Sequence, residues 1–338
     1  MRTHSADRIE WPAGDTAARV LGASPRRRGP IARLILSALA QVYGGVVRLR
    51  NLAYDRQLLR TRRVGIPVIS IGNIVAGGAG KTPFTRWLAG EVMGRGRNVA
   101  ILHGGYGADE PALHRHWQSG AIVFDKRDRS AAAQEAAAAG ADVIILDDAF
   151  QHRRLERDLD IVLLPIESTS TRLLPRGPLR EPESALGRAD LIVVTRKTQP
   201  AEAARALAGR LRRSLGKPCA VAAVLPGDIV HAGKRQMTRP AEFAVVTAVA
   251  RPDLLRAQLD AFGVRVVRML AYPDHHEYSA RDVAYILRTA GALPILTTEK
   301  DAMKLLQLVE HDRLWIIEQH VAIEEGMDAI TAIIERVL

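Results

Sequence analysis

The stretch that most constrains this chain is a glycine-rich turn between an apolar run and a helix-forming segment, at residues 69–83. The apolar residues 67–71 predict a buried strand, and Pro83 suits the first turn of a helix that starts at Lys81. Backbone N–H groups of such a turn can surround a phosphate, and the helix N-terminus adds a positive dipole. We therefore expect Lys81 to reach phosphates and the Thr82 hydroxyl to ligate Mg²⁺. The predicted phosphate cradle consists of Gly77, Gly78, Ala79, Gly80, Lys81, Thr82 and Pro83.

One position departs from the usual spacing of such a loop. The common pattern G-x-x-x-x-G-K-[ST] would place glycine at position 75, where this chain has Val75. The core of the pattern, residues 77–82, is intact, which favours nucleotide binding over a turn that is merely rich in glycine.

The charge of the chain is concentrated at its N-terminus. Residues 1–63 hold 13 arginines, no lysine and four acids, a net charge of +9, which leaves +2 of the total of +11 for the rest. We therefore expect no nucleic-acid partner for the body of the protein. The single cysteine, Cys219, excludes an intramolecular disulfide and a metal site built from cysteines, in line with a reducing compartment.

The arginine-rich region contains an apolar helical tract at residues 31–59. Its uncharged core, residues 34–47, has 14 residues, about 21 Å of helix against a hydrocarbon core of about 30 Å. We expect a helix that lies in the headgroup region of an anionic membrane, held there by its flanking arginines. A buried helix is an alternative. A signal peptide, suggested by Ala38-Leu39-Ala40, is another, although Arg33 interrupts its apolar region.

From residue 64 onward, strands and helices alternate. Near-continuous apolar strands separated by helices predict a parallel sheet covered on both faces. Residues 225–238 interrupt the pattern and suggest a short hairpin between two lobes. The predicted strands are 68–71, 99–102, 121–124, 143–146, 161–164, 191–195 and 220–224, and then 243–249, 264–270, 294–297 and 314–317. Predicted helices start at Lys81, Arg129, Pro200, Pro252, Ser279 and Glu299, and one closes the chain. The expected domains are 1–62, 63–224, a β linker at 225–240, and 241–338.

Two adjacent acids, Asp147 and Asp148, end a predicted buried strand. Ligands of open α/β sheets bind at the carboxyl ends of the strands, where a carboxylate beside a phosphate loop is the usual second anchor for Mg²⁺. We expect Thr82, Asp147 and Asp148 to hold the metal, with the start of a turn as the alternative. Gln151 and His152, which follow, could contact phosphate or substrate or be structural.

Three further clusters are candidates. Asp109 follows the second predicted strand in a glycine-rich segment interpreted as a loop, and the charged loop 174–181 could hold an anionic substrate. His275 and His276 lie in a short acidic turn, where an acid–base or substrate role is favoured and a structural turn is the alternative. A zinc site is less favoured, because adjacent histidines lack the spacing of a helical metal site. The third cluster, which could contact a nucleotide or merely begin a helix, is Glu299, Lys300 and Asp301.

Taken together, these motifs closely resemble the tetraacyldisaccharide 4′-kinase family of the lipid A pathway. The resemblance extends from about residue 24 to the C-terminus and rests on ordered motifs at 70–83, 106–111, 147–152, 174–181, 273–275 and 298–301. It implies an ATP- and Mg²⁺-dependent lipid kinase that phosphorylates the 4′-hydroxyl of tetraacyldisaccharide 1-phosphate in lipopolysaccharide synthesis. It also implies a peripheral protein, expected to be a monomer, at the cytoplasmic face of the inner membrane. The implied fold is a P-loop-type α/β/α sandwich with a second, smaller α/β/α lobe joined by a short β linker, besides the N-terminal helix.

The resemblance also implies roles for single residues. Lys81 and Thr82 would hold phosphates and Mg²⁺, and Asp147 and Asp148 would serve the metal. Asp109 and His275 would form a dyad that activates the sugar hydroxyl, since a carboxylate can orient an imidazole that accepts the proton. The positions that match further residues serving the site are Arg129, Arg180 and Glu181.

Two departures from the family pattern are evident. His103-Gly104-Gly105-Tyr106-Gly107 replaces the usual Ser-Arg-Gly-Tyr-Gly-Gly, with almost no spacer before Asp109, and Ala149 replaces the glycine that commonly follows the two acids. Two other hypotheses remain open. One is a GTPase-like metal-insertion or targeting factor, and the other is a catalytically weakened membrane-bound ATP-binding protein.

Overall fold

A computed structural model describes residues 9–12, 29–105, 109–118, 120–168, 170–233 and 238–338. The chain forms two compact units. The P-loop unit comprises Arg28–Val224 and Val321–Leu338, and the second unit comprises Leu225–His320 with the N-terminal residues. The chain passes from one unit to the other within strand β8 (Cys219–His231) and returns within strand β12 (Leu314–Glu325). The predicted break after residue 224 therefore falls inside a continuous strand rather than in a hairpin.

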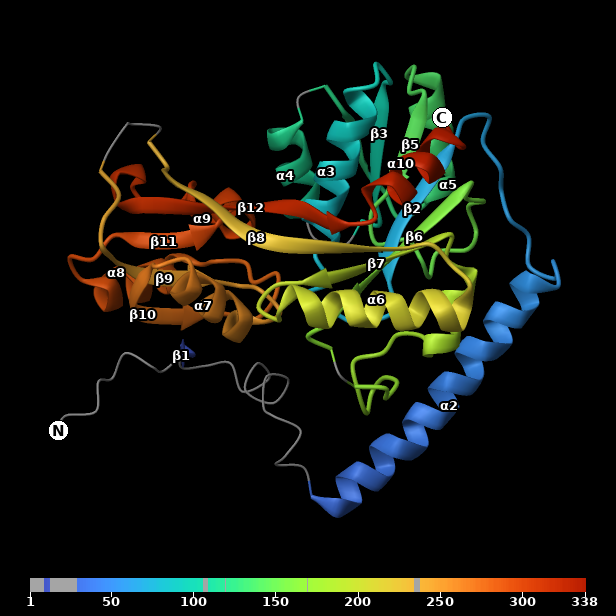
Figure 1. The fold of residues 1–338 in the computed structure, drawn as a ribbon. Coiled ribbons are helices and arrows are strands. Elements are labelled where there is room, and N and C mark those ends of the chain that lie inside the picture. The colour runs from blue at the N-terminus through green and yellow to red at the C-terminus, as the bar shows by residue number, and fades with distance from the viewer. Residues whose placement is uncertain (1–8, 13–28, 106–108, 119, 169, 234–237) are drawn as a thin grey trace. The chain divides into compact units, whose positions relative to one another are not determined.

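The P-loop unit contains a parallel sheet in the order β8-β7-β6-β2-β5-β3-β4 (Figure 1). Every predicted strand of this series is present within two residues at its N-terminal end. The strands are β2 (Val68–Asn73), β3 (Val99–His103), β4 (Ile122–Asp125), β5 (Val143–Leu146), β6 (Leu159–Pro165) and β7 (Leu191–Arg196), followed by the first half of β8. Strand β2, which precedes the phosphate loop, pairs with both β5 and β6.

Helices cover both faces of this sheet, as the apolar strands predict. Alternate strand residues point to opposite faces, so that Ile69 and Ile145 pack in one core and Val68 and Ile144 in another. Helices α3 (Lys81–Met93) and α10 (Met327–Glu335) pack on the first face. Helices α5 (Arg129–Ala138) and α6 (Ala201–Leu215) pack on the opposite face. The unit is therefore an α/β/α sandwich.

One helix of the P-loop unit was not predicted. Residues Asp109–Trp117 form helix α4, whereas the sequence suggested a loop here. Asp109 and Glu110 in the first turn complement the helix dipole, and Pro111 is tolerated there because the first N–H groups need no partner within the helix. The loop interpretation of Asp109 was wrong for this reason: the three residues form a helix start.

The second unit repeats the architecture on a smaller scale, with the strand order β1-β10-β9-β11-β12. Ser279 and Asp282 form the predicted capping box at the start of α8. Helices α8 and α9 pack on one face of the sheet and α7 on the other. The elements are β1 (Ile9–Glu10), β9 (Glu242–Thr247), α7 (Pro252–Ala261), β10 (Arg265–Ala271), α8 (Ala280–Ala290), β11 (Ile295–Thr298) and α9 (Glu299–Leu305).

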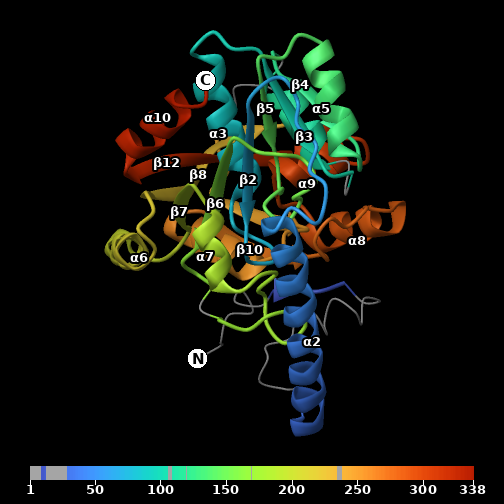
Figure 2. The same ribbon diagram turned by 90° about the vertical axis from the view of Figure 1, so that its right-hand side faces the viewer.

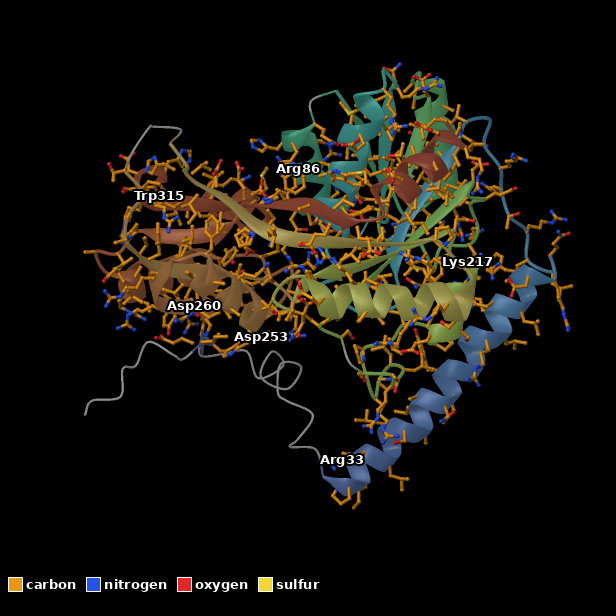
Figure 3. The ribbon with its side chains drawn as sticks, in the orientation of Figure 1. Arg33, Arg86, Lys217, Asp253, Asp260 and Trp315 are labelled. Carbon is orange, nitrogen blue, oxygen red and sulfur yellow. The ribbon has the colours of Figure 1, made fainter. Side chains whose placement is uncertain are left out.

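The N-terminal apolar tract forms a single helix, α2 (Pro30–Asp55), within the P-loop unit (Figure 2). It has 26 residues, so it is longer than the uncharged core that the sequence defines. By length and apolar composition the helix is able to cross a membrane. This is weak evidence for a membrane span, because signal sequences and the core helices of soluble proteins meet the same criterion. Arg33 lies near its N-terminal end (Figure 3). The large apolar side chains that remain exposed on α2 are Ile31, Leu34, Ile35, Leu39, Val42, Val46, Leu49 and Leu52.

Candidate active site

The phosphate loop connects the end of β2 to the start of α3. Gly77, Gly78 and Gly80 have φ angles of 76°, 65° and 79°, a region that L-residues with a Cβ seldom adopt. At Gly80 a Cβ would also lie 2.7 Å from a methyl carbon of Val224, so both backbone and space require glycine. No side chain caps the N-terminus of α3, which leaves its first N–H groups directed at an anion site. The loop thus has the geometry of a phosphate cradle.

The departure at Val75 has a structural explanation. Val75 is buried, forms an antiparallel bridge with Leu179 and packs in the core beside Ile74. The neighbouring Ala76 N–H donates to the Pro178 carbonyl at 2.7 Å. Val75 is not among the described residues with positive φ, so no glycine is needed. The valine instead fastens the loop to the segment that carries Arg180.

The second acid of the Asp147-Asp148 pair faces the phosphate loop. The Asp148 carboxylate lies 3.6 Å from Lys81 Nζ and accepts hydrogen bonds from Arg180 Nη1 at 2.9 and 3.0 Å. Buried Arg129 donates to the backbone carbonyls of both acids. These contacts gather two cations beside one carboxylate, and Arg129 positions the turn that bears it.

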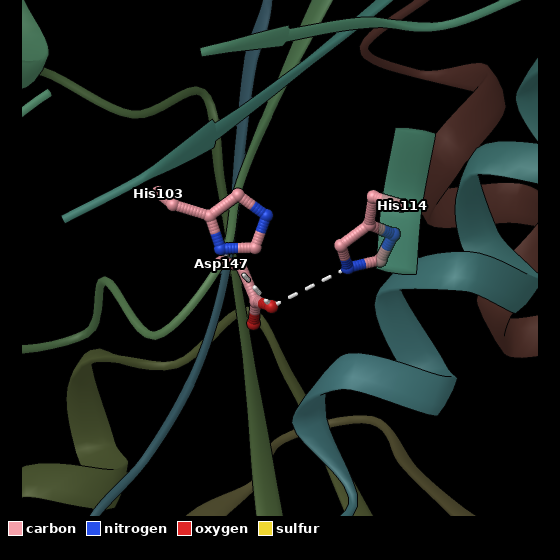
Figure 4. A group of neighbouring side chains, drawn as sticks. All are labelled: His103, His114 and Asp147. Carbon is pink, nitrogen blue, oxygen red and sulfur yellow. Dashed lines mark ion pairs between the residues drawn. The ribbon is translucent and has the colours of Figure 1, made fainter. Parts of the chain in front are cut away.

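The first acid has a different environment. The Asp147 carboxylate oxygen Oδ2 lies 3.8 Å from His103 Nδ1 and 3.6 Å from His114 Nε2, and all three residues are buried (Figure 4). Burial, only partly opposed by the charge of Asp147, lowers the pKa of His103 from its ordinary value of 6.5 to about 4. Although burial favours the protonated acid, His114 and His103 hold the pKa of Asp147 below its ordinary value. At neutral pH, His103 is therefore neutral and Asp147 is a carboxylate.

Helix α4 brings a further carboxylate to the loop. The Thr82 hydroxyl donates to Glu110 Oε1 at 3.0 Å, and the adjacent Asp109 is buried, with Oδ1 accepting from the Glu110 N–H at 3.2 Å. Glu110, His103 and His114 were not among the predicted site residues. If residues 109–117 had been recognised as a helix, Glu110 and His114 would have been candidates. They lie four residues apart, in successive turns, and so on the same face as each other.

Glu181 and Gln151 belong to a buried network below the loop. Gln151 Nε2 donates to the Asn73 carbonyl at 2.8 Å and to Glu181 Oε1 at 3.2 Å. Glu181 is fully buried and also accepts from Arg188 at 3.1 Å and from Asn51 of α2 at 2.6 Å. Glu181 therefore helps to position α2, and Gln151 helps to position the end of β2. A contact of either residue with substrate stays a prediction.

His152 is half-buried behind the acids. Burial, reinforced by the charges of Arg129, Arg157 and Arg154, lowers its pKa from 6.5 to about 4. Its Nε2 atom is buried without a hydrogen-bond partner among the described groups. At neutral pH the ring is therefore uncharged.

In the second unit the adjacent histidines separate into two environments. His276 stacks on Tyr272 and contacts the capping residue Asp282 at 3.2 Å, so it is structural. The side chain of His275 is 41% exposed, its φ is 60°, and Lys304 binds its backbone carbonyl at 3.2 Å. In the described part of the chain, no cluster of three metal-ligating side chains includes either histidine. The turn therefore presents His275 to its surroundings and holds His276 within the unit.

The cluster at the start of α9 is largely occupied by internal contacts. Buried Asp301 accepts from Thr247 at 3.1 Å, from the Ala248 N–H at 3.0 Å and from Thr298 at 2.8 Å. Lys300 Nζ pairs with Asp274 at 2.6 Å, and Glu299 accepts from the Gln319 N–H at 3.0 Å. These contacts favour a helix start over a nucleotide contact. The dyad partners Asp109 and His275 belong to different units, and their pairing stays a prediction.

A parallel, doubly covered sheet whose central strand ends in this glycine loop, with acids at the end of the adjacent strand, defines a P-loop-type nucleotide-binding enzyme. A family model described as tetraacyldisaccharide-1-P 4′-kinase matches residues 32–116 and 108–338. The chain therefore belongs to the tetraacyldisaccharide 4′-kinase family, as the sequence motifs predicted, and is a phosphotransferase.

Individual relatives agree over nearly the whole chain. A tetraacyldisaccharide 4′-kinase of Anaeromyxobacter dehalogenans (strain 2CP-C) is 37% identical in an alignment that covers 90% of this chain and 92% of that protein. The corresponding protein of Syntrophus aciditrophicus (strain SB) is also 37% identical, over 83% and 86% of the two chains. The crystal structure of LpxK from Aquifex aeolicus in complex with ATP has a TM-score of 0.72 at 26% identity, covering 90% of this chain and 99% of that one. These comparisons favour neither the GTPase-like factor nor the catalytically weakened membrane-bound ATP-binding protein.

Proposed function

We propose that this chain transfers the γ-phosphate of ATP to the 4′-hydroxyl of a tetraacyldisaccharide 1-phosphate, a step of lipid A biosynthesis. The observation that carries the proposal is the arrangement of Lys81, Asp148 and Arg180 beside the uncapped N-terminus of α3. Phosphoryl transfer requires mainly alignment of the reactants and neutralisation of the phosphate charge. Backbone N–H groups and two cations supply both, with Asp148 holding the cations in place until a nucleotide binds.

The side chains near Thr82 fit a magnesium ion. The Thr82 hydroxyl and the Glu110 carboxylate are 3.0 Å apart, and oxygen atoms of this kind are the ligands that Mg²⁺ prefers. Thr82, Asp148 and Glu110 would hold the ion, and Asp147 could contribute its Oδ1 atom, which is buried without a hydrogen-bond partner. Bound Mg²⁺ would neutralise charge on the β- and γ-phosphates.

The acceptor hydroxyl needs a base, for which Asp109 and His275 are the candidates. Asp109 is buried in the first turn of α4, beside Glu110, and His275 is exposed on the turn before α8. In this mechanism His275 accepts the proton of the 4′-hydroxyl, and Asp109 orients the imidazole and stabilises its charged form.

A lipid acceptor requires access to a membrane surface. Helix α2 exposes a continuous apolar face and carries Arg33, Arg48 and Arg50. These features support peripheral attachment of the monomer to the anionic cytoplasmic face of the inner membrane, where ATP is available.

The kinase assay supplies labelled ATP, Mg²⁺ and tetraacyldisaccharide 1-phosphate in detergent micelles. We expect label in the lipid, and a folded protein that binds ATP without labelling the lipid would refute the proposal. Lys81→Ala should reduce kcat/KM by about 10²-fold or more, the usual effect of removing an electrostatic contact to the transition state. Lys126→Ala is the matched control, because Lys126 is half-exposed and pairs with Glu135.

The base is tested separately. Asp109→Asn and His275→Gln should each lower kcat by about 10²-fold or more while leaving the Kd for ATP within about twofold, since general base catalysis commonly contributes that much. Single-turnover kinetics with ATP binding measured in parallel separates the two effects. Undiminished transfer in either variant would remove that residue from the mechanism.

A further inference from the structure

We propose that His103, His114 and Asp147 form a binding site for a divalent transition-metal ion of the Zn²⁺ type, adjacent to the magnesium site of the kinase reaction. The Oδ2 atom of Asp147 faces the two histidines, and its other oxygen is the one assigned above to the magnesium site. The three side chains come from three elements that meet at the carboxyl edge of the sheet. His103 ends β3, Asp147 follows β5, and His114 lies in α4 (Figure 4).

The spacing of the ligand atoms suits one shared ion. One nitrogen or oxygen from each residue lies within 4.8 Å of the other two. The distances from Asp147 Oδ2 are 3.8 Å to His103 Nδ1 and 3.6 Å to His114 Nε2. Ligands about 2.0–2.1 Å from a tetrahedral zinc ion lie about 3.4 Å apart, so small side-chain adjustments would close the site.

Most polar atoms in this cluster have no hydrogen-bond partner among the residues that the structure describes. His114 is fully buried and His103 is 4% exposed, and Asp147 is 1% exposed. Both His114 nitrogens, His103 Nε2 and both Asp147 oxygens are buried without a hydrogen bond to any described group. Buried polar groups are normally satisfied, because leaving them unpaired costs about 1–3 kcal/mol each. An ion at the centre would use one lone pair from each residue.

The kind of ligand selects the kind of metal. Two imidazoles and one carboxylate are typical of Zn²⁺ and its neighbours in the first transition row, whereas Mg²⁺ prefers oxygen ligands and bound water. Three protein ligands would leave a fourth position for water. Thr82 and Glu110 lie within hydrogen-bond distance of each other in a separate group with oxygen donors only.

The bound ion would connect α4 to the sheet. The first turn of α4 carries Asp109 and Glu110, and the second carries His114. One coordinate bond at His114 and others at the ends of β3 and β5 would thus hold the helix start beside the phosphate loop. Metal binding is independent of catalysis, so failure of the kinase assay would leave it standing.

The test is titration of chelator-treated full-length protein with Co²⁺ and Zn²⁺, in excess Mg²⁺ and without nucleotide. We expect one equivalent of Co²⁺ to give the intense visible absorption of a low-coordinate site, and Zn²⁺ to displace it. His103→Asn and His114→Gln should each weaken binding by at least about tenfold, the lower range seen when even supporting residues of metal sites are changed. His116→Gln is the matched control, since His116 is an exposed histidine on the same helix.

A second measurement does not depend on the variants being folded. Hydrogen exchange of the wild-type protein should show Zn²⁺-dependent protection of residues 109–117 and the end of β3. Absence of stoichiometric binding by the wild type would overturn the proposal and leave only a buried carboxylate beside two imidazoles. Binding that survives in folded His103→Asn and His114→Gln, or protection confined to other segments, would place the ion elsewhere and overturn it equally.

Discussion

At the scale of single residues, two glycines with the same backbone conformation meet different surroundings. Gly80 and Gly96 have φ angles of 79° and 76°. A Cβ at Gly80 would meet Val224 at 2.7 Å, whereas nothing lies within 4 Å of one at Gly96. Position 96 therefore requires glycine only because of its backbone conformation. Position 80 requires it for the same reason and also because the side chain of Val224 in β8 lies so close.

Alanine substitutions at these two positions separate the cost of backbone strain from the cost of a steric clash with Val224. Gly96→Ala should lower the free energy of unfolding by about 1–2 kcal/mol, the cost of a left-handed conformation for alanine. Gly80→Ala should cost more than that and should also weaken ATP binding, since the N–H groups of the cradle would move. Urea denaturation and ATP titration of both variants provide the measurement. Equal effects on stability, with ATP affinity unchanged, would contradict the assignment.

His152 gives a prediction about pH. Because its folded-state pKa of about 4 lies below the ordinary 6.5, the unfolded chain binds a proton first as the pH falls. The unfolding free energy therefore includes the full contribution of neutral His152 above pH 6.5 and loses it progressively as the pH falls to 4. His152→Gln should therefore flatten the fall in unfolding free energy between pH 7 and pH 4.5, measured by denaturation at several pH values. The exposed His116→Gln should leave this fall unchanged, and an equal slope in both variants would argue against a half-buried, neutral His152.

At the scale of elements, α2 has two faces with different tasks. Ala40, Gly44 and Val47 recur at helical spacing on the buried face, where Asn51 reaches Glu181. The opposite face leaves Leu34, Val42, Val46 and Leu49 more than half exposed, an unusual amount of apolar surface for a helix end in water. Deleting the helix would remove the hydrogen bond of Asn51 to buried Glu181, so substitution on the exposed face is the cleaner test.

Leu39→Asp combined with Val46→Asp should weaken association with anionic vesicles by at least about tenfold. Each buried aliphatic side chain contributes about 1.5–3 kcal/mol, and tenfold in affinity corresponds to about 1.4 kcal/mol. Vesicle cosedimentation measures the effect, with Leu308→Asp as control, since Leu308 is an exposed leucine of the second unit. Undiminished sedimentation of the double variant would show that α2 does not contact the membrane through this face.

The elements also show where sequence reasoning succeeds. Runs such as Val143–Leu146 are apolar at every position, as expected of a strand that is buried on both faces. Helix α4 was missed because its residues, DEPALHRHW, are mostly polar and its apolar face is narrow. Its position is decided by packing and by charge at its first turn, which a search for hydrophobic periodicity does not weigh.

At the scale of the whole molecule, the C-terminal segment belongs with the first series of strands. Ile330, Ile333 and Ile334 of α10 pack against Ile69 and Phe84 in the core of the P-loop unit. The sequence grouped residues 241–338 together, because neighbours in the chain were expected to pack together. The contacts instead place Val321–Leu338 with the P-loop unit.

Ile330→Ala should lower the unfolding free energy by about 2–5 kcal/mol, the usual cost of truncating a buried isoleucine. Since α10 packs in the P-loop unit, hydrogen exchange should quicken in β2 and β5 more than in β9 and β11. Ile295→Ala, a fully buried position of the second unit, should produce the reverse pattern. Uniform acceleration in all four strands, from either variant, would mean that the units unfold as one.

The sequence by itself determined the class of fold, the phosphate loop and the family. These follow from local rules, because glycine conformation, apolar runs and motif order are all properties of neighbouring residues. Tertiary structure decided which of two adjacent acids serves which partner: Asp148 meets Lys81 and Arg180, whereas Asp147 meets His103 and His114. Those partners lie 32 to 67 residues away along the chain, and only the packing of parallel strands and α4 brings them within contact distance.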